Sequence, residues 1–477
     1  MIEKSLKIGI IALWLLSVPL TDNALAQDAA GTAAAVAPNP IDTGDTAWML
    51  VSSALVLLMT PGLAFFYGGL VRSRNVLNTM MMSLVMMGVI GVTWTLWGYS
   101  LAFDVSTPAS EGFGKGIESF IGGFDWMFLN KVTADTPDPI GYAPTIPHQV
   151  FMVYQMMFAI ITPALISGAI VERVTFKTYF WFVLLWSTFI YSPLAHWVWG
   201  RGWLGAMGAL DFAGGTVVHI SSGVSAVVAA WVIGPRKDHL NKPHTPHNVP
   251  YVLLGIGMLW FGWFGFNGGS ALGSGSLATV AFVTTMISAA AGGLTWTIVE
   301  WVLRGKPTAV GIASGFLAGL VGITPAAGFV LPVGALLIGS ITSVCCFFAV
   351  SFRVKLGFDD SLDTFPIHGV GGTVGAILTG VFATKAVNAF GNNGLFAGNP
   401  GLIVTQLVGI LATYLFAGVG TFAILKILGQ FMELRVPLSA EDQGLDIGQH
   451  GEEAYGEDFA GGFSSFESSS PFAPKKI

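Results

Sequence analysis

The sequence has 477 residues, of which 53% are hydrophobic and only 10% charged, and its mean hydropathy is +0.70. These values exclude an ordinary soluble domain and are typical of a protein that crosses the membrane many times. The net charge of -6 is spread along the chain without a basic patch, which argues against nucleic acid as a partner.

Residues 1–26 have the pattern of a cleavable secretory signal peptide. Two lysines precede an apolar run over 8–20, and Ala-Leu-Ala follows at 24–26. The run is shorter than the roughly 20 residues that a spanning helix needs, so an uncleaved first span is the weaker alternative. We expect the signal to be removed and residues 27–45 to form a short periplasmic or extracellular leader.

The rest of the chain predicts an all-α polytopic membrane protein. We expect a membrane domain over 46–430 and a polar, acidic tail over 431–477. Eleven apolar segments are long enough to be transmembrane helices, at 46–69, 77–101, 148–170, 178–198, 212–233, 249–270, 277–303, 308–323, 328–351, 367–384 and 401–430.

The loop charges predict the orientation. Eleven lysines and arginines lie in the loops on one side of these segments and four in the loops on the other. The richer side is expected to be cytoplasmic. The N-terminus is therefore predicted outside and the tail in the cytoplasm, in a multi-pass protein of the cell (inner) membrane, embedded in the lipid bilayer.

The span count also predicts an inverted repeat. If spans one to five and six to ten are related units, the odd number of crossings makes the second unit enter from the opposite side. His219 lies in the fifth span and His368 in the tenth, and both stretches contain Gly-Gly-Thr-Val. The two histidines are therefore expected near each other at mid-membrane.

Ionisable groups are costly in apolar membrane sequence, so Asp211, His219 and His368 are candidates for function. Asp211 stands where the fifth span begins, and it is either a cation attractor or a helix N-cap, roles that do not exclude each other. The histidines either line a pore or are core residues bonded to backbone carbonyls. Burial disfavours the charged imidazole, so we expect both rings to be neutral.

Three other groups of polar residues have ordinary interpretations. His239, His244 and His247 are expected in a solvated cytoplasmic loop rather than a metal site. Glu300 with Arg304, and Glu172 with Arg173, are each interpreted as an interfacial pair. No third metal ligand accompanies the deep histidines and no nucleophile–base pair is recognisable, so the sequence predicts no metal site, no catalytic residue, no cofactor and no enzymatic activity.

The run over 259–270 places aromatic residues between glycines and ends at Ser270. Rings beside a cation site attract the cation, and rings stacked across a lumen exclude water. A generic belt of aromatic residues at the membrane interface is the alternative.

Several of these stretches closely resemble the ammonium transporter (Amt/AmtB) family. The resemblance covers about 48–455 and lies in Asp211-Phe-Ala-Gly-Gly-Thr-Val-Val-His219, Gly262-Trp-Phe-Gly-Phe-Asn267, Arg304-Gly-Lys-Pro307, Gly319-Leu-Val-Gly-Ile-Thr-Pro325 and His368-Gly-Val-Gly-Gly372. It implies eleven transmembrane helices in an inverted five-helix repeat, a homotrimer with one pore per subunit, and ammonium or ammonia as the substrate.

The resemblance also implies roles for individual residues. Phe158, Trp199 and Ser270 are implied to form an external recruitment site for NH4+, with Asp211 supporting it. Phe158 and Phe266 are implied to stack as a gate.

Beyond the gate, the resemblance implies a lumen formed by His219 and His368 and lined by Trp263. Within the tail, Gly444-Leu-Asp446 and 450–455 are similar to the family's regulatory tail, which docks PII-type nitrogen regulators. The expected function is recruitment of NH4+, its deprotonation, and conduction of NH3 with or without a coupled proton. A transporter-like ammonium sensor and a Rhesus-type gas channel are the alternatives.

Overall fold

The computed structural model describes residues 40–106, 112–237, 239, 245–356 and 358–455. The predicted signal peptide, His244 and the tail after 455 lie outside the described residues. The secondary structure of the described residues is helical, and a single isolated β-bridge joins Val174 and Arg435. The α-helices are α2 (Thr43–Leu70), α3 (Val76–Thr93), α4 (Tyr99–Phe103), α5 (His148–Ile170), α6 (Phe176–Trp186), α7 (Ser192–Val198), α8 (Trp203–Ala206), α9 (Ser221–Ile233), α10 (Val249–Gly268), α11 (Ser276–Arg304), α12 (Ala309–Ile323), α13 (Pro332–Leu356), α14 (Gly371–Phe382), α15 (Gly401–Leu428) and α16 (Leu438–Gln443).

The predicted spans all fall on helices. In the described part of the chain, nine helices are long and apolar enough to cross a membrane, and α12 is a shorter apolar helix. The segment from α6 to α7 is also helical throughout, because a π-helical turn at Ser187–Tyr191 joins its two parts. The all-α polytopic fold is thus confirmed, and the arrangement is consistent with eleven crossings. The ninth span begins later than predicted, since residues 324–331 form turns ahead of α13.

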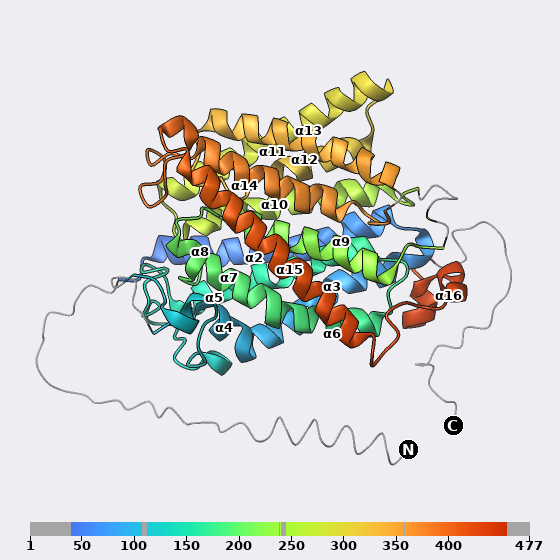
Figure 1. The fold of residues 1–477 in the computed structure, drawn as a ribbon, viewed down its shortest axis with the longest axis horizontal. Helices are drawn as coiled ribbons and strands as arrows, with labels where there is room; N and C mark the ends of the chain where they lie inside the picture. The colour runs from blue at the N-terminus through green and yellow to red at the C-terminus, as the bar shows by residue number, and fades with distance from the viewer. Residues whose placement is uncertain (1–39, 107–111, 238, 240–244, 357, 456–477) are drawn as a thin grey trace, which may run out of the picture. The chain divides into compact units, whose positions relative to one another are not determined.

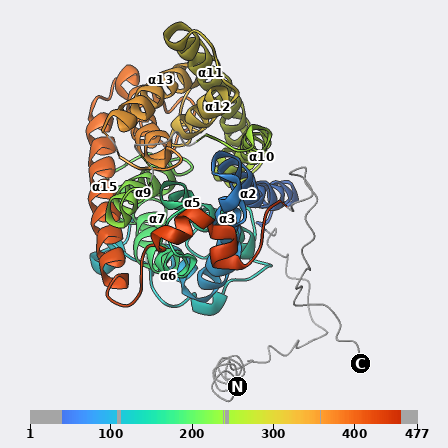
Figure 2. The same ribbon diagram turned by 90° about the vertical axis from the view of Figure 1, so that its right-hand side faces the viewer.

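The helices form two groups that follow each other along the chain. Figures 1 and 2 show the first group, from α2 to α9, in blue to green beside the second group, from α10 to α14, in yellow-green to orange. Helices α2 and α10, the first of each group, pack along one another. Helix α15 contacts α9 of the first group and α14 of the second, and so bridges them.

The two deep histidines occupy equivalent positions in the two groups. His219 lies in a π-helical segment, Gly215–Ile220, that leads directly into α9. His368 lies in a π-helical segment of the same length, Phe365–Val370, that leads directly into α14. Local π-helical turns widen a helix and recur at functional sites. The matching positions are those that the inverted repeat predicts.

Glycines allow these two helices to cross at very short range. Gly223 and Gly372 each follow their histidine by four residues. A Cβ atom on Gly223 would lie 2.2 Å from the backbone nitrogen of Gly369, and one on Gly372 would lie 2.8 Å from the carbonyl oxygen of Gly215. No larger residue fits at either crossing point without moving a backbone. The reciprocal contact brings the histidines of the two groups together.

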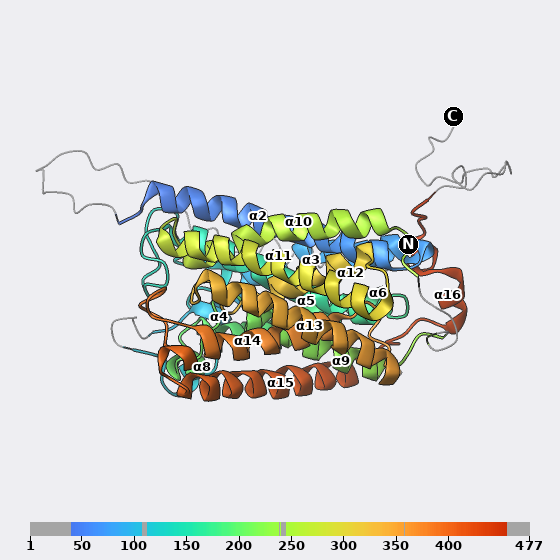
Figure 3. The same ribbon diagram turned by 90° about the horizontal axis from the view of Figure 1, so that it is seen from above.

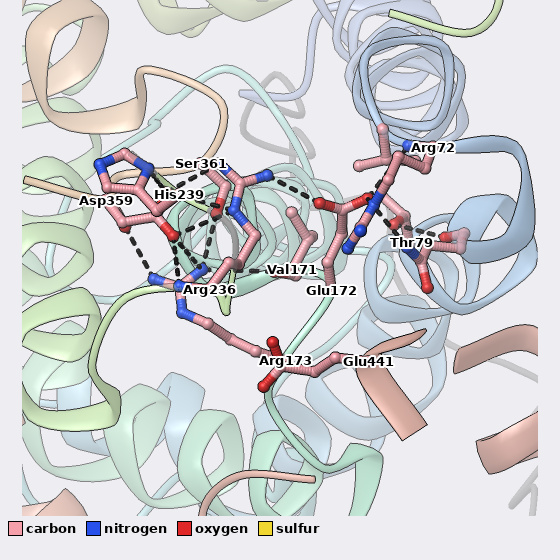
Figure 4. Close-up of polar contacts among 12 residues, drawn as sticks. Arg72, Thr79, Val171, Glu172, Arg173, Arg236, His239, Asp359, Ser361 and Glu441 are labelled. Atoms are coloured by element: carbon pink, nitrogen blue, oxygen red, sulfur yellow. Dashed lines mark hydrogen bonds and ion pairs between the residues drawn. The ribbon is translucent and has the colours of Figure 1, made fainter. Parts of the chain in front are cut away.

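A buried network of charges joins the groups at the end of the bundle where α16 lies (Figure 4). Arg236, after α9, donates from Nη1 to Glu172 Oε2 and from Nη2 to Asp359 Oδ1, each at 2.7 Å. Glu172 Oε1 also accepts from Arg72 Nε and Asn75 Nδ2, each at 2.8 Å. These residues come from the chain segments that follow α2, α5, α9 and α13. The network therefore fastens four loops at one end of the bundle.

Arg173 completes this network and is fully buried. Its guanidinium donates to Gly234 O at 2.7 Å, Ser361 Oγ at 2.6 Å and Asp359 O at 2.7 Å. The prediction that Glu172 and Arg173 form an ordinary interfacial pair is wrong, because each binds partners from other loops. Chain segments distant in sequence supply those partners, which the local pattern could not indicate.

The described histidines of the loop after α9 are also more enclosed than predicted. The His239 side chain is 11% exposed, with Nδ1 at 3.1 Å from Asp359 Oδ1. His247 is half-buried, and its ring nitrogens lie 2.8 Å from Val71 O and 2.8 Å from Tyr455 Oη. The expectation of a solvated loop is therefore wrong for these two residues, because the loop folds against the bundle and the tail.

The described part of the tail, 431–455, packs against the bundle. Its helix α16 lies at the end opposite α4 and α8 (Figures 1 and 3). The backbone nitrogen of Leu445 donates to Asn75 Oδ1, and Asp446 Oδ1 accepts from the backbone nitrogen of Asn78, both at 2.8 Å. The tail is thus hydrogen-bonded to Asn75, just before α3, and to Asn78 in the first turn of α3.

The charge network predicts a pH-dependent stability. Burial alone would raise the pKa of Glu172, but the charges of Arg236 and Arg72 outweigh burial and lower the pKa to about 2. A depressed pKa means that ionised Glu172 stabilises the fold above the ordinary glutamate pKa, and this stabilisation is lost as pH falls from about 4.5 towards 2. Its size is about 3 kcal/mol by linkage. We expect Glu172→Gln to lower the melting temperature at neutral pH.

Thermal unfolding in detergent at a series of pH values measures this effect. The difference between the wild type and Glu172→Gln should shrink below about pH 4.5, where the wild type loses its own advantage. Glu433→Gln, at an exposed tail residue, is the control and should unfold like the wild type. A Glu172→Gln melting temperature equal to that of the wild type at pH 7 would contradict the assignment.

Candidate functional site

The two deep histidines contact each other. Their Nδ1 atoms lie 3.1 Å apart, and the rings are nearly parallel, with centroids 5.2 Å apart and planes at 19°. One nitrogen must donate and the other accept, which two neutral imidazoles can do. Both residues are buried. In the described part of the chain, His219 Nε2 has no hydrogen-bond partner, so this ring offers one free nitrogen to its surroundings.

Asp211 holds the start of the helix that carries His219. Its Oδ1 accepts from the backbone nitrogens of Gly214 and Gly215 at 2.8 and 2.6 Å. Its Oδ2 accepts from those of Thr216 and Val217 at 2.8 and 3.1 Å. Both carboxylate oxygens are thus engaged by the first amides of the helix, as in an N-cap.

Asp360 does the same for the helix that carries His368. Its two oxygens accept from the backbone nitrogens of Thr364 at 3.0 Å and Phe365 at 2.6 Å. Asp360 precedes His368 by eight residues, and Asp211 precedes His219 by the same number. Asp360 was not among the residues predicted from the sequence, although the shared spacing could have identified it.

A cavity of about 10 Å³ lies beside the two histidines. A space of this size holds about one water-sized molecule. Its wall consists of His219 and His368 with the apolar residues Met59, Leu63, Ile161, Leu165, Val218, Leu259, Trp263, Phe266 and Leu317. We call this space the lumen.

Aromatic rings close one end of the lumen. Phe158 and Phe266 have centroids 4.3 Å apart, and Phe266 lies 6.2 Å from the His219 ring. Trp263 stacks on His219 at 5.5 Å with planes at 20°. Its Nε1 donates to Thr324 Oγ1 at 2.9 Å, which fixes the indole orientation. The Phe158–Phe266 pair therefore separates the lumen from the space beyond it.

Beyond that pair lies a cavity of about 290 Å³, which we call the aromatic vestibule. Trp199 meets Phe158 edge to face, with centroids 5.8 Å apart and planes at 79°. Ser270 Oγ donates to Phe266 O at 2.8 Å and lies 3.1 Å from Tyr154 Oη, which leaves a lone pair for a further donor. No charged side chain of the described residues lines this cavity, whose wall is Phe103, Tyr142, Phe151, Gln155, Phe158, Val198, Trp199, Phe212, Ser270 and Leu272.

A larger cavity of about 570 Å³ begins on the other side of His368, and we call it the charged vestibule. Both signs of charge line it, from Arg236, His239, Glu300, Arg304, Arg353 and Asp363. Arg353 Nε lies 2.7 Å from Asp363 Oδ1, but burial outweighs this neighbour and raises the pKa of Asp363 to about 6. The passage thus has an uncharged end and a charged end.

Seven of the eight predicted site residues line this passage. Phe158, Trp199 and Ser270 line the aromatic vestibule, and Trp263, Phe266, His219 and His368 line the lumen. Asp211 lines neither cavity, but its carbonyl oxygen accepts from Trp199 Nε1 at 2.9 Å and so positions that ring. Sequence reasoning missed Gln155 and Thr324. Gln155 lies one helical turn before Phe158, a spacing that could have indicated it.

The described residues contain no group of three or more histidine, cysteine, aspartate or glutamate side chains that could hold a metal ion. The polar groups of the lumen and the aromatic vestibule are imidazoles, hydroxyls, indole N–H groups and an amide, which bind small donors and acceptors of hydrogen bonds.

The fold and the passage define a multi-spanning membrane protein in which a narrow apolar lumen connects two cavities. Residues 47–455 match the model of the Ammonium Transporter Family. The ammonium transporter of Bacillus subtilis (strain 168) is 50% identical over 413 residues, which cover 86% of this chain and 98% of that protein.

Solved structures agree with this match. The crystal structure of Saccharomyces cerevisiae Mep2 has a TM-score of 0.77 at 37% identity, covering 83% of this chain and 88% of that one. A structure described as a sensor Amt protein has a TM-score of 0.75 at 29% identity, covering 85% of this chain and 98% of that one. The chain belongs to the ammonium transporter family, and it is a membrane transport protein rather than an enzyme.

The capping contacts predict what substitution of Asp211 does. Asp211→Asn keeps one acceptor oxygen but turns an amide NH2 towards two backbone N–H donors, so we expect a loss of at least about 1–2 kcal/mol in stability. Asp360→Asn should behave alike. Fluorescence-detected size exclusion and thermal unfolding in detergent measure the folded yield and the stability. Asp125→Asn, whose side chain is 75% exposed, is the control. Unchanged melting of Asp211→Asn would show that the cap is dispensable.

Proposed function

We propose that this transporter binds NH4+ in the aromatic vestibule, removes a proton before the Phe158–Phe266 pair, and conducts NH3 through the lumen past His219 and His368. The observation that carries the proposal is the size and lining of the lumen, about 10 Å³ between apolar side chains and two imidazoles. NH3 is a neutral, water-sized molecule that can both donate and accept hydrogen bonds.

The cost of removing water from NH4+ determines where along the passage the ion loses its proton. An ion that enters the lumen loses its water shell, and no carboxylate among the described residues lines the lumen to replace it. Moving an unpaired charge into such a site costs many kcal/mol, of order 10 in an apolar medium. Deprotonation in the vestibule avoids this cost. In the lumen, one ring of the neutral pair donates through Nδ1 and the other accepts. The first ring then has an unprotonated Nε2 and the second a protonated Nε2, so the pair can supply an acceptor and a donor in place of water.

The aromatic vestibule suits the charged form of the substrate. The faces of Trp199 and Phe158 attract a cation by the cation–π interaction, and Ser270 Oγ accepts a hydrogen bond from it. Asp211 supports the vestibule by holding Trp199 and adding negative potential from a short distance. A protonated ion is thereby held where it can still lose its proton to water.

Two alternatives explain the chain less well. A sensor that resembles a transporter is supported by one similar structure, whereas the relatives at 50% and 48% identity are both named ammonium transporters. A Rhesus-type gas channel would not need a cation site, and Phe158, Trp199 and Ser270 together favour the ammonium-binding branch.

We also propose a homotrimer in the cell (inner) membrane, with the aromatic vestibule outside and the charged vestibule in the cytoplasm. A PII-type nitrogen regulator would then bind at the charged end. The contacts of 431–455 with Asn75 and with the first turn of α3 support a tail that is folded against the bundle rather than free. We further propose that residues 1–26 are a cleaved signal peptide.

Single substitutions of the histidines test the lumen. We expect His219→Ala or His368→Ala to abolish ammonium transport or to admit K+. Removing an imidazole widens the lumen, and water that enters the wider lumen can keep an ion hydrated there. Ammonium-induced current in proteoliposomes, with the external pH varied, measures flux and shows whether the proton follows. Size exclusion confirms that each variant keeps its oligomeric state. If both variants retain wild-type flux and still exclude K+, the histidines do not form the conducting path.

Truncation tests the tail. Ending the chain after Pro437 removes α16 and the contacts of Leu445 and Asp446, so we expect reduced recovery of a PII-type protein from membranes at low 2-oxoglutarate. Ending it after Tyr455 keeps those contacts and is the matched control. Equal PII recovery and equal transport by both truncated chains and the full-length protein would leave the tail without this role.

A further inference from the structure

His196 is a fully buried histidine that lines none of the three cavities described above. It lies in the last turn of α7, three residues before Trp199. Its Nδ1 is 3.0 Å from Ala102 O, and its Nε2 is 2.6 Å from Glu118 O. Both partners are backbone carbonyl oxygens, which accept hydrogen bonds and cannot donate them.

This arrangement requires two N–H groups on one ring. A neutral imidazole has one N–H and one lone pair, so one carbonyl oxygen would face a lone pair at hydrogen-bond distance. The imidazolium has both N–H groups and satisfies both oxygens. The contacts of His196 are therefore those of the charged ring. They differ from the contact between His219 and His368, which one donor and one acceptor satisfy.

Helix ends surround the His196 ring and favour its charge. Ala102 O lies in the last turn of the helical segment Ser73–Phe103, and His196 itself lies in the last turn of the continuous helix that α6 and α7 form. The carbonyl end of a helix carries a partial negative charge that stabilises a cation. The carboxylate of Glu118 acts in the same direction. Burial opposes the charge, so the ring keeps its proton only while these groups surround it.

Two other charged side chains lie next to these groups in the sequence, and each is engaged elsewhere. Asp104 Oδ2 accepts from the backbone nitrogen of Asp125 at 2.6 Å. The guanidinium of Arg201 lies over the Phe113 ring, 5.2 Å from its centroid. Glu118 is therefore the charged residue whose own backbone binds the ring.

The hydrogen bond to Glu118 O joins the segment after α4 to the end of α7. Two further contacts do the same: Trp197 Nε1 donates to Phe120 O at 2.8 Å, and the backbone nitrogen of Gly114 donates to Arg201 O at 3.1 Å. Residues 114–120 thus pack along the chain from α7 to Arg201, and this stretch includes Trp199.

The turn after Trp199 is closely packed against His196. A Cβ atom on Gly200 would lie 2.0 Å from Ala102 O and 2.8 Å from His196 Nδ1. The backbone nitrogen of Gly202 donates to His196 O at 2.9 Å. A shift of either carbonyl oxygen away from the ring would therefore be felt by the backbone that carries Trp199.

We propose that protonated His196 is a positioning residue for the aromatic vestibule, and that loss of its proton at high external pH loosens the turn that carries Trp199. This inference rests on the proposed function, because it takes Trp199 as part of the cation site. When the ring becomes neutral, one carbonyl oxygen faces a lone pair, and the two must separate. The vestibule should then bind NH4+ less tightly.

The charge on the ring is measured without transport. In protein with 15N-labelled histidine, NMR in bilayers distinguishes the two N–H nitrogens of an imidazolium from the unlike nitrogens of a neutral ring. The signal that is missing in His196→Gln assigns the residue. We expect two protonated nitrogens at about pH 6, below the ordinary histidine pKa, and loss of one proton as the pH rises. A neutral His196 at about pH 6 would overturn the proposal.

Ammonium-induced current in proteoliposomes measures the consequence. The external pH is raised in steps from about 6 until His196 loses its proton, and the half-saturating concentration is calculated for NH4+ alone. In the wild type we expect it to rise about fivefold as the NMR signal titrates, with a smaller change in maximal current. His196→Gln should show no such rise and should stay near the high-pH value of the wild type. His196→Asn takes its place if that variant does not fold.

His247→Gln is the matched control. This histidine binds Val71 O at the other end of the bundle and lines none of the three cavities, so the variant should keep the wild-type rise. A half-saturating concentration that does not follow the titration of His196, or that rises equally in His196→Gln, would overturn the positioning role and leave the transporter assignment intact. A wild-type protein without ammonium-dependent current would instead refute the proposed function.

Discussion

The cost of moving a charge out of water is the constraint on which the rest of this structure depends. Beside His219 and His368 the passage narrows to about 10 Å³ with an otherwise apolar wall. The carboxylates at the start of the two helices that carry the histidines do not line this narrow space: Asp211 and Asp360 each bind the first backbone amides of a helix. Charge is thus confined to the ends of the bundle, and the centre keeps only groups that donate or accept hydrogen bonds while neutral.

Backbone geometry makes such a centre possible. Two helices that start with π-helical turns cross where Gly223 and Gly372 leave room for the opposite backbone. Because the crossing repeats in both groups, each histidine reaches the other from an equivalent position, and their nitrogens come within hydrogen-bond distance. At the charged end, Arg236 binds Glu172 and Asp359, and these ion pairs hold the loops of both groups together. Each buried charge has a partner, because an unpaired buried charge would destabilise the fold. The crossing at the histidines and the charge network thus meet the same requirement, which is that a polar group buried in a membrane protein has a partner.

The sequence predicted the membrane helices and the histidine pair because hydropathy, span count and rare deep ionisable residues are local signals. It did not predict the partners of Glu172 and Arg173, since these come from loops that meet only after folding. Asp360 was missed although its eight-residue spacing to His368 repeats that of Asp211 to His219. The roles of Phe158 and Trp199 came from family resemblance alone, because a single aromatic residue in an apolar helix has no local feature that separates a pore ring from a packing ring.

Selection and conduction have different physical requirements, and the proposed mechanism separates them in space. Rings and oxygen acceptors in the aromatic vestibule attract any small cation, so binding there cannot by itself exclude K+. A metal ion has no proton to lose, however, and must carry its charge into a space that holds about one water-sized molecule. Ammonium alone among these ions becomes neutral by giving up a proton. Discrimination then follows from acid–base chemistry at the Phe158–Phe266 pair rather than from ionic radius, and the lumen needs no charged residue to achieve it.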